Sequence, residues 1–207
     1  MVKSKPYNIL YLTFIVFLLV NCSNNAFTDE EALLEYLKDE ENGYVQRKSV
    51  NGIDFELMYR PTDLLVKQEL GDSIISDRVK VLRDKYSKYL YFNLSMSKNN
   101  KELLSTTPKN RAEFGQMVNQ LVFGMNEKVH LYTQSNDTIQ MIDYVYPRLY
   151  GMGKSSSLMF VFQRDEKKLK EEYLNFNIQD FGLLTGEVNF KVSSQKVNKE
   201  PYIQFKN

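Results

Sequence analysis

Asn51-Gly52 is the sequence feature that most limits what this chain can fold into. The pair lies between two strand-like runs, 44–50 and 53–60, and apolar residues alternate with polar ones in the second run. Asn-Gly between two such runs is the strongest short signal of a β-hairpin, because both turn residues need positive φ angles. The pattern therefore predicts an antiparallel pair of strands with one face buried.

Helical spacing is concentrated in the first half of the chain. Thr28 and Glu31 have the capping-box spacing, and Pro108 is a residue type suited to the first helical position. Gly71 and Gly124 lie where two of the helices are expected to end. The predicted helices are 28–39, 62–70, 77–88 and a helix from Thr107-Pro108 to the region of Gly124.

Strand patterns dominate the second half. The alternation at 90–97 predicts a strand with one buried face, and from residue 128 onward one strand-like run follows another. These later runs are 128–134, 138–146, 158–163, 173–178, 187–192 and 202–205. The whole pattern predicts an α+β fold, with helices mainly in the N-terminal half and an antiparallel sheet built mainly from C-terminal hairpins.

The first residues of the chain form a short basic segment and then an apolar run. Residues 1–8 contain Lys3 and Lys5 and no acid, and in 9–20 only Thr13 is polar. A helix over 9–20 spans about 18 Å, against about 30 Å for the hydrocarbon core of a bilayer. The run is therefore too short to cross a membrane and fits the apolar region of a signal peptide.

The apolar run ends near Cys22, the only cysteine in the chain. Leu19-Val20-Asn21-Cys22 resembles the lipobox of bacterial lipoproteins, in which signal peptidase II cuts before a cysteine that carries a thioether-linked lipid. Leu19, Val20 and Cys22 fit the pattern, whereas Asn21 stands where Gly, Ala or Ser is usual, as in the relaxed lipoboxes of Bacteroidetes and spirochaetes. The resemblance covers residues 1–22. The alternatives are an uncleaved anchor helix, an ordinary secretory signal and a cytosolic protein.

The resemblance implies a signal peptide over 1–21, a lipidated tether over 22–27 and one α+β domain over 28–207. Acyl chains such as palmitate on Cys22 would hold the mature protein on the membrane of the cell envelope. Ser23 stands in place of the Asp that retains enteric lipoproteins at the inner membrane, so the expected location is the outer membrane where the source has one. The mature domain then keeps no thiol for a disulfide, a metal site or a nucleophile.

Composition limits the expected partners. The formal net charge is +1 for the whole chain and becomes −1 once Lys3 and Lys5 leave, and no cluster of Lys and Arg stands out in the sequence. No nucleic-acid partner is therefore expected. The chain has 14 Tyr, 13 Phe and no Trp, a composition that fits half-buried strands and also occurs on sugar- and protein-binding surfaces. The expected partners are the membrane, through Cys22, and envelope proteins or glycan.

Two motifs bear on catalysis and cofactors. Gly151-Met-Gly-Lys-Ser155 contains part of a phosphate-binding loop, but Arg148 stands where the first glycine of that loop belongs. The segment is interpreted as a loop that joins strands, or alternatively as the rim of a binding surface. His130 is the only histidine, which excludes a His-rich metal site, and the chain has no Gly-x-Ser-x-Gly motif. No cofactor is expected.

The expected function is that of a non-enzymatic binding or assembly module, acting through an aromatic sheet face. One alternative is a hydrolase of envelope polymers that uses paired carboxylates, of which Asp54 and Glu56 on one strand face are candidates. The simpler interpretation of these two acids is the solvated side of a strand. A further alternative is a carrier of a small ligand, which needs a closed apolar pocket among the C-terminal strands.

Ser73 and Thr138 are possible sites of O-glycosylation. Asp72-Ser73-Ile74 and Asp137-Thr138-Ile139 resemble the sequence that is O-glycosylated in Bacteroidetes, an Asp followed by Ser or Thr and then by an apolar residue. Both segments fall in expected loops. The resemblance implies that a glycan is attached to each hydroxyl.

Overall fold

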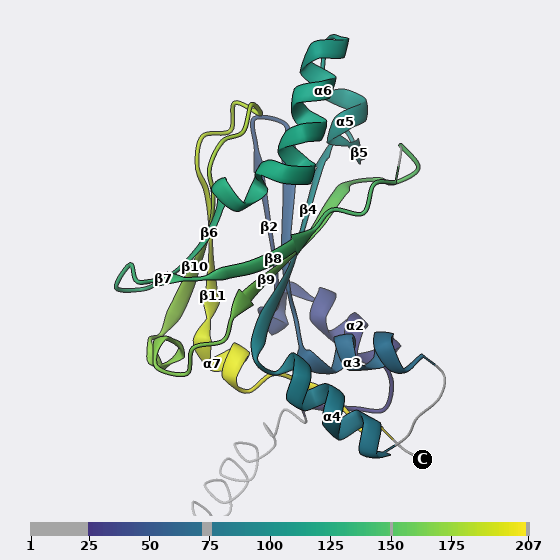
Figure 1. Cartoon of the computed structure of the whole chain (residues 1–207), viewed down its shortest axis with the longest axis vertical. Coiled ribbons are helices and arrows are strands. Elements are labelled where there is room, and N and C mark those ends of the chain that lie inside the picture. The colour runs from purple at the N-terminus through teal and green to yellow at the C-terminus, as the bar shows by residue number, and fades with distance from the viewer. Residues whose placement is uncertain (1–24, 72–75, 150, 206–207) are drawn as a thin grey trace, which may run out of the picture.

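The computed structural model describes residues 25–71, 76–149 and 151–205. These residues contain six α-helices and twelve strands, and the strands form three sheets. Helices lie at two opposite ends of the domain (Figure 1). The predicted α+β class with antiparallel sheets is confirmed, and the helices lie mainly in the N-terminal half as predicted.

The larger sheet is antiparallel and has the strand order β2-β3-β4-β9-β8, with β5 paired to β4. Its strands are β2 (Val45–Val50), β3 (Ile53–Arg60), β4 (Tyr89–Lys98), β5 (Lys101–Glu102), β8 (Met141–Val145) and β9 (Ser156–Gln163). The β2–β3 hairpin turns at Asn51 and Gly52, with φ angles of 50° and 73°. The hairpin predicted from Asn-Gly is therefore confirmed.

The smaller sheet has the order β11-β10-β6-β7. Its strands are β6 (Val129–Thr133), β7 (Thr138–Ile139), β10 (Tyr173–Ile178) and β11 (Val188–Ser193). Only Gln140 separates β7 from β8, yet β7 pairs with β6 in this sheet whereas β8 pairs with β9 in the larger one. The run predicted as one strand over 138–146 is thus shared between two sheets, because its pairing partner changes at Gln140.

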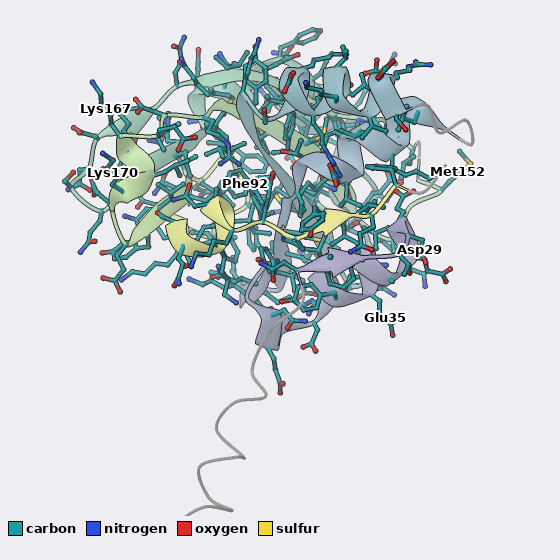
Figure 2. The ribbon with its side chains drawn as sticks, turned by 90° about the horizontal axis from the view of Figure 1, so that it is seen from below. Asp29, Glu35, Phe92, Met152, Lys167 and Lys170 are labelled. Atoms are coloured by element: carbon teal, nitrogen blue, oxygen red, sulfur yellow. The ribbon has the colours of Figure 1, made fainter. Side chains whose placement is uncertain are left out.

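Phenylalanine rings fill the space between the two sheets. Phe176 of β10 lies against Phe92 of β4 and against Phe160 and Phe162 of β9, at ring-centroid distances of 5.4, 5.8 and 6.0 Å. All four side chains are fully buried, and Phe92 lies near the middle of the molecule (Figure 2). Rings at these distances and tilts pack favourably as well as burying apolar area. Packing between sheets therefore accounts for these rings.

The open edges of the two sheets, β2 and β11, are joined by side chains rather than by a backbone ladder. Gln46 Nε2 donates a hydrogen bond to the Lys191 carbonyl at 2.6 Å, and Lys48 Nζ donates to the carbonyl of Asn189. Both donors come from β2 and both acceptors lie on β11. We call this junction the β2–β11 seam.

Helices cover the two ends of the paired sheets (Figure 1). One end holds α2 (Glu30–Lys38), α3 (Thr62–Leu70) and α4 (Ser76–Tyr86), and the other holds α5 (Leu103–Thr106) and α6 (Arg111–Asn119). A short helix, α7 (Ser194–Asn198), follows β11. α3 and α4 pack together through a small apolar cluster of Val66, Leu70, Val79 and Leu82.

The cap of α2 differs from the prediction. Asp29, not Thr28, is the N-cap: its Oδ1 accepts a hydrogen bond from Ala32 N at 2.9 Å. Thr28 Oγ1 instead donates to Asp29 Oδ2 at 2.8 Å. Both residue types are good caps, and the carboxylate is the stronger acceptor, so the helix begins one residue later than the capping-box spacing indicated.

The start predicted for the next long helix is wrong. α6 begins at Arg111 after the N-cap Asn110, so Pro108 lies outside it. Asn110 Oδ1 accepts from Glu113 N at 3.0 Å, and Asn110 Nδ2 donates to Glu113 Oε1 at 2.8 Å. This reciprocal pair satisfies the helix start better than a proline, which has no side chain able to accept a hydrogen bond.

The two ends of the described chain pair with each other. β1 (Ala26–Phe27) runs parallel to β12 (Tyr202–Ile203), and Tyr202 N donates to the carbonyl of Asn25 at 2.8 Å. Asn25 Nδ2 also donates to the Lys199 carbonyl at 2.9 Å. Part of the segment 22–27, expected to be a tether, is therefore held against the domain.

Candidate functional site

A polar groove lies on the outer face of the larger sheet. It has a volume of about 460 Å³, and its walls include the outward side chains of β2, β3 and β4. We call it the sheet-face groove. Strand register places these side chains in two rows, Ser49-Asp54-Ser97 and Arg47-Glu56-Ser95.

Alternation along the strands explains why these residues face outward. Phe55 and Leu57 of β3 are buried between the sheets, so Asp54 and Glu56 point to the other side. Met96 of β4 is buried opposite Phe55 in the same way. The same alternation along β4 indicates that Asn93, Ser95 and Ser97 face solvent, so the sequence does contain a signal for the serines of the groove.

Ion pairs fix one side of the groove. Arg47 Nε lies 2.7 Å from Glu56 Oε2, and Arg47 Nη1 lies 2.7 Å from Glu40 Oε1. The hydrogen bond to Glu40 raises the pKa of Arg47 above its ordinary value, and the bond to Glu56 acts in the same direction. Asp54 is exposed, and its carboxylate has no hydrogen bond to another described residue. Asp54 is therefore the acceptor that a ligand in the groove finds free.

The hydroxyl groups of Ser95 and Ser155 line the opposite side. Ser95 Oγ and Ser157 Oγ are 2.8 Å apart, and Ser155 Oγ lies 3.2 Å from Ser157 Oγ. Each hydroxyl both donates and accepts. The groove thus offers a chain of small groups that can exchange their mutual hydrogen bonds for bonds to a ligand.

The glycine-containing loop forms part of the rim. Gly153 N donates to Glu102 Oε1 at 2.7 Å, and a Cβ at Gly153 would lie 2.8 Å from the Leu149 side chain. Gly151 has a φ of 83°. These contacts require glycine for packing and turning, and they carry Lys154 and Ser155 to the groove. Met152, beside them, is 85% exposed at the periphery of the domain (Figure 2).

The structure brings together some of the predicted site residues and separates others. Asp54, Glu56 and Lys154 line the same groove, although they come from different parts of the chain. His130 lies on β6 in the smaller sheet, opposite Asn177 of β10, and does not line it. Among the described residues no group of three or more His, Cys, Asp or Glu side chains is placed to hold a metal ion.

Cys22 and Ser73 lie outside the described residues. Thr138 is exposed at the start of β7, directly after the turn in which Asn136 has a φ of 67°. Its hydroxyl therefore lies where an enzyme acting on the folded protein finds it, and its glycosylation stays a prediction.

Comparison with protein-family models, with curated proteins and with solved structures finds no match. None of the helices in residues 25–71, 76–149 and 151–205 has the length and apolar character that crossing a bilayer requires.

Proposed function

We propose that the protein is an envelope lipoprotein whose domain binds a hydroxyl-rich envelope glycan in the sheet-face groove. The observation that carries the anchoring is Leu19-Val20-Asn21-Cys22 at the end of an apolar run, followed almost at once by the folded domain. Asn25 is already hydrogen-bonded to the C-terminal segment. Three residues reach at most about 10 Å, so a lipid on Cys22 would hold the domain close to the membrane surface.

The chemistry of the groove supports a neutral polar ligand. The groups that a ligand can reach are the Asp54 carboxylate, the Lys154 ammonium and serine hydroxyls that can exchange their mutual hydrogen bonds. The Arg47 guanidinium is already paired with two acids. Small donors and acceptors of both kinds match the hydroxyl and amide groups of a glycan. The phenylalanines of the sheet lie between the layers, so the support for a glycan comes from these polar groups rather than from an aromatic face.

Anchoring is tested by the mass and the location of the mature protein. We expect material extracted from membranes to begin at Cys22 with added acyl mass, and a Cys22→Ala protein to leave the membrane fraction. Ser23→Ala, at the adjacent position, is the matched control and should stay anchored. Fractionation of the two membranes tests the proposed outer-membrane location. Native material that still begins at Met1, or that lacks acyl mass, rules out the anchor.

Glycan binding is tested by calorimetry with soluble glycan fragments of the envelope. We expect Asp54→Asn to weaken binding by about tenfold, the effect of removing a charge-assisted hydrogen bond. Asp143→Asn, on the outward side of β8, is the control that should leave binding unchanged. Equal affinities for all three proteins would remove the groove as the binding site.

Hydrolysis is the second candidate function, because Asp54 and Glu56 line one groove. The bond between Glu56 and Arg47 favours binding over hydrolysis, since one of the two carboxylates that a hydrolase would use is already engaged by a guanidinium. Chromatography of the glycan after incubation separates the two functions. Shortened products that disappear with Asp54→Asn would establish a hydrolase, whereas an unchanged glycan supports a binding module.

A further inference from the structure

A second groove, of about 540 Å³, lies at the α6 end of the domain. It runs between the β2–β3 turn, α6 and the loop 179–187, which joins β10 to β11. Figure 1 shows these three elements at the end of the domain opposite α3 and α4. Its walls include the apolar side chains of Ile53, Met117 and Leu183, which are buried, and its rim carries Leu184. We call it the end groove.

Cations without partners surround the end groove. Lys98 and Lys109 line it, Lys101 follows Lys98 by three residues, and Arg111 follows Lys109 by two. Within the described part of the chain none of the four forms a salt bridge. Glu113 is the one acid among the lining residues, and its two oxygens accept hydrogen bonds from Lys109 N and Asn110 Nδ2 at 2.8 Å each. The groove therefore has a surplus of positive charge.

Two of these cations are placed against each other. Lys98 and Lys101 are direct partners across the β4–β5 hairpin, whose turn residues Asn99 and Asn100 have φ angles of 53° and 57°. Like charges directly opposite on paired strands destabilise the pair. The hairpin thus carries an unfavourable arrangement that an anion would relieve.

The rim of the groove contains backbone strain. Leu184 has a φ of 59° and its side chain is 80% exposed. A bulky residue in the left-handed region costs energy and persists only where its surroundings hold it. Asn51 Nδ2 donates to the Leu184 carbonyl at 3.1 Å and so supports this conformation. The strain presents an apolar side chain to solvent, which folding alone does not favour.

The helix at the groove is irregular as well. The turn after α6, Gln120–Gly124, is π-helical. This form is rare in proteins overall, and where it occurs it is often at a functional site. Gln120 and Thr107 both line the groove, and Gln120 Nε2 and Thr107 Oγ1 are buried without a hydrogen-bond partner. Strain, repulsion and unpaired polar atoms thus meet at one place, the pattern expected where binding rather than stability shaped the sequence.

We infer that the end groove binds an acidic peptide segment of a partner protein. The carboxylates of the peptide pair with Lys98 and Lys109, and an apolar side chain between them packs on Met117 and Leu184. Charge complementarity selects this occupant, because the groove combines unpaired cations with an apolar floor. The site is separate from the sheet-face groove and does not depend on the lipid, so its failure leaves the proposed function untouched.

Fluorescence anisotropy with labelled synthetic peptides tests the inference on the full chain in detergent. The probe alternates Glu with Leu, and the control peptide has Lys in place of each Glu. We expect the acidic peptide to bind. Lys98→Glu and Lys109→Glu should each weaken binding by about tenfold or more, because each substitution removes a charge-assisted hydrogen bond and adds a charge that repels the peptide. Leu184→Ser should weaken it too. Lys170→Glu, at an exposed position in Lys168–Lys170, is the matched control and should bind normally.

Thermal unfolding of the same variants separates binding from folding. Lys98→Glu replaces a repulsive pair by an attractive one, so we expect its midpoint of unfolding to equal or exceed that of the unchanged protein although its binding is weaker. Absence of binding by the acidic peptide, equal binding of both peptides, or a loss with Lys170→Glu as large as with Lys98→Glu would overturn the inference. Tighter binding to vesicles of anionic lipid than to the peptide, with the same dependence on Lys98, would assign the groove to a membrane instead and reject a peptide partner.

Discussion

Asp63 of α3 and Arg83 of α4 form a two-point ion pair that also holds the C-terminal strand. Arg83 Nε lies 2.8 Å from Asp63 Oδ1, and Arg83 Nη2 lies 2.6 Å from Asp63 Oδ2. Ile203 N donates to Asp63 Oδ2 at 2.7 Å, and the Ile203 carbonyl accepts from Arg83 Nη2 at 2.9 Å. One buried carboxylate therefore joins two helices to β12, and through β12 to β1.

Asp63→Asn should destabilise the domain by about 3 kcal/mol, the lower part of the range for breaking a buried ion pair, because the Arg83 side chain is 41% exposed and partly solvated. Urea denaturation measures the change in the free energy of unfolding. Glu69→Gln, which breaks the exposed Lys85–Glu69 pair, is the control and should leave the midpoint almost unchanged. Equal changes in the free energy of unfolding from the two substitutions would show that the buried network stabilises the domain no more than an exposed ion pair does.

Phe176→Ala should cost about 3–5 kcal/mol, because it empties the position against which three other rings pack. Phe176→Leu should cost less, since it keeps most of the volume. Phe123→Ala removes a ring that is 73% exposed and serves as the control, with little expected change. The free energies of unfolding from denaturant titration decide; a similar small loss in all three would contradict a packed core centred on Phe176.

The domain should lose stability at high pH through its buried tyrosines. Burial raises the pKa of Tyr44 to about 12 and raises the pKa of Tyr59 well above its ordinary value, with the charge of Glu200 acting in the same direction on both. In the unfolded chain these phenols titrate near pH 10. Their folded pKa values are the higher ones, so their contribution is complete below about pH 10 and is lost as the pH rises through the folded values.

Tyrosinate absorbance against pH checks this expectation, with the protein in urea as the reference. We expect late-titrating phenols in the native protein and none in urea. Glu200→Gln should lower the pKa of Tyr59, because it removes the negative charge that accepts the Tyr59 Oη hydrogen bond at 2.5 Å. Native and urea titrations that coincide would show that these rings are solvated.

Lys48→Val should make the domain associate with itself. The Lys48 ammonium lies 5.2 Å from the centre of the Phe190 ring at the β2–β11 seam, and a charge on an edge strand discourages pairing with another chain. Sedimentation velocity should show a larger dimer fraction for this variant. Lys80→Val, on the exposed side of α4, tests whether any lost lysine has that effect; dimerisation by both would remove the role of the seam.

Thr138→Ala should remove one glycan if the Asp-Thr-Ile sequence is modified. Mass spectrometry of the native protein should find added sugar mass on the peptide that carries Thr138 and none after the substitution. Gln134→Ala, in the same exposed turn region, should keep the modification. An unmodified peptide from native protein contradicts the prediction.

Local sequence patterns predict much of the fold but little of the candidate site. Asn51-Gly52 marked its hairpin because the turn needs only two residues, whereas Thr28 and Pro108 misplaced helix starts because Asp29 and Asn110, nearby, cap better. The acids of β3 and Lys154 were each noticed in the sequence. Their meeting in one groove depends on the order β3-β4-β9, which no local pattern contains.

Pairing between strands that are far apart in the sequence could not be predicted, because it too is absent from any local pattern. Nothing within Ala26–Phe27 indicates a parallel partner at Tyr202–Ile203, and nothing at Gln140 indicates that the strand changes sheets there. The sequence does not predict the end groove, because Lys98, Lys109 and Leu184 come together only in the folded chain. The unpaired charges of the two lysines and the backbone strain at Leu184 can be recognised only once the neighbours of these residues in the fold are known.

The β2–β11 seam gives the domain one line along which its layers can part while every backbone ladder stays intact. At the opposite edge the chain itself joins the layers, because β7 of the smaller sheet continues through Gln140 into β8 of the larger one. At the seam the layers are joined by side-chain contacts from Gln46 and Lys48. We therefore expect any breathing motion to open the domain at the seam, and amide protons that face it from β2 and β11 should exchange with solvent before those of the central strands β4 and β10.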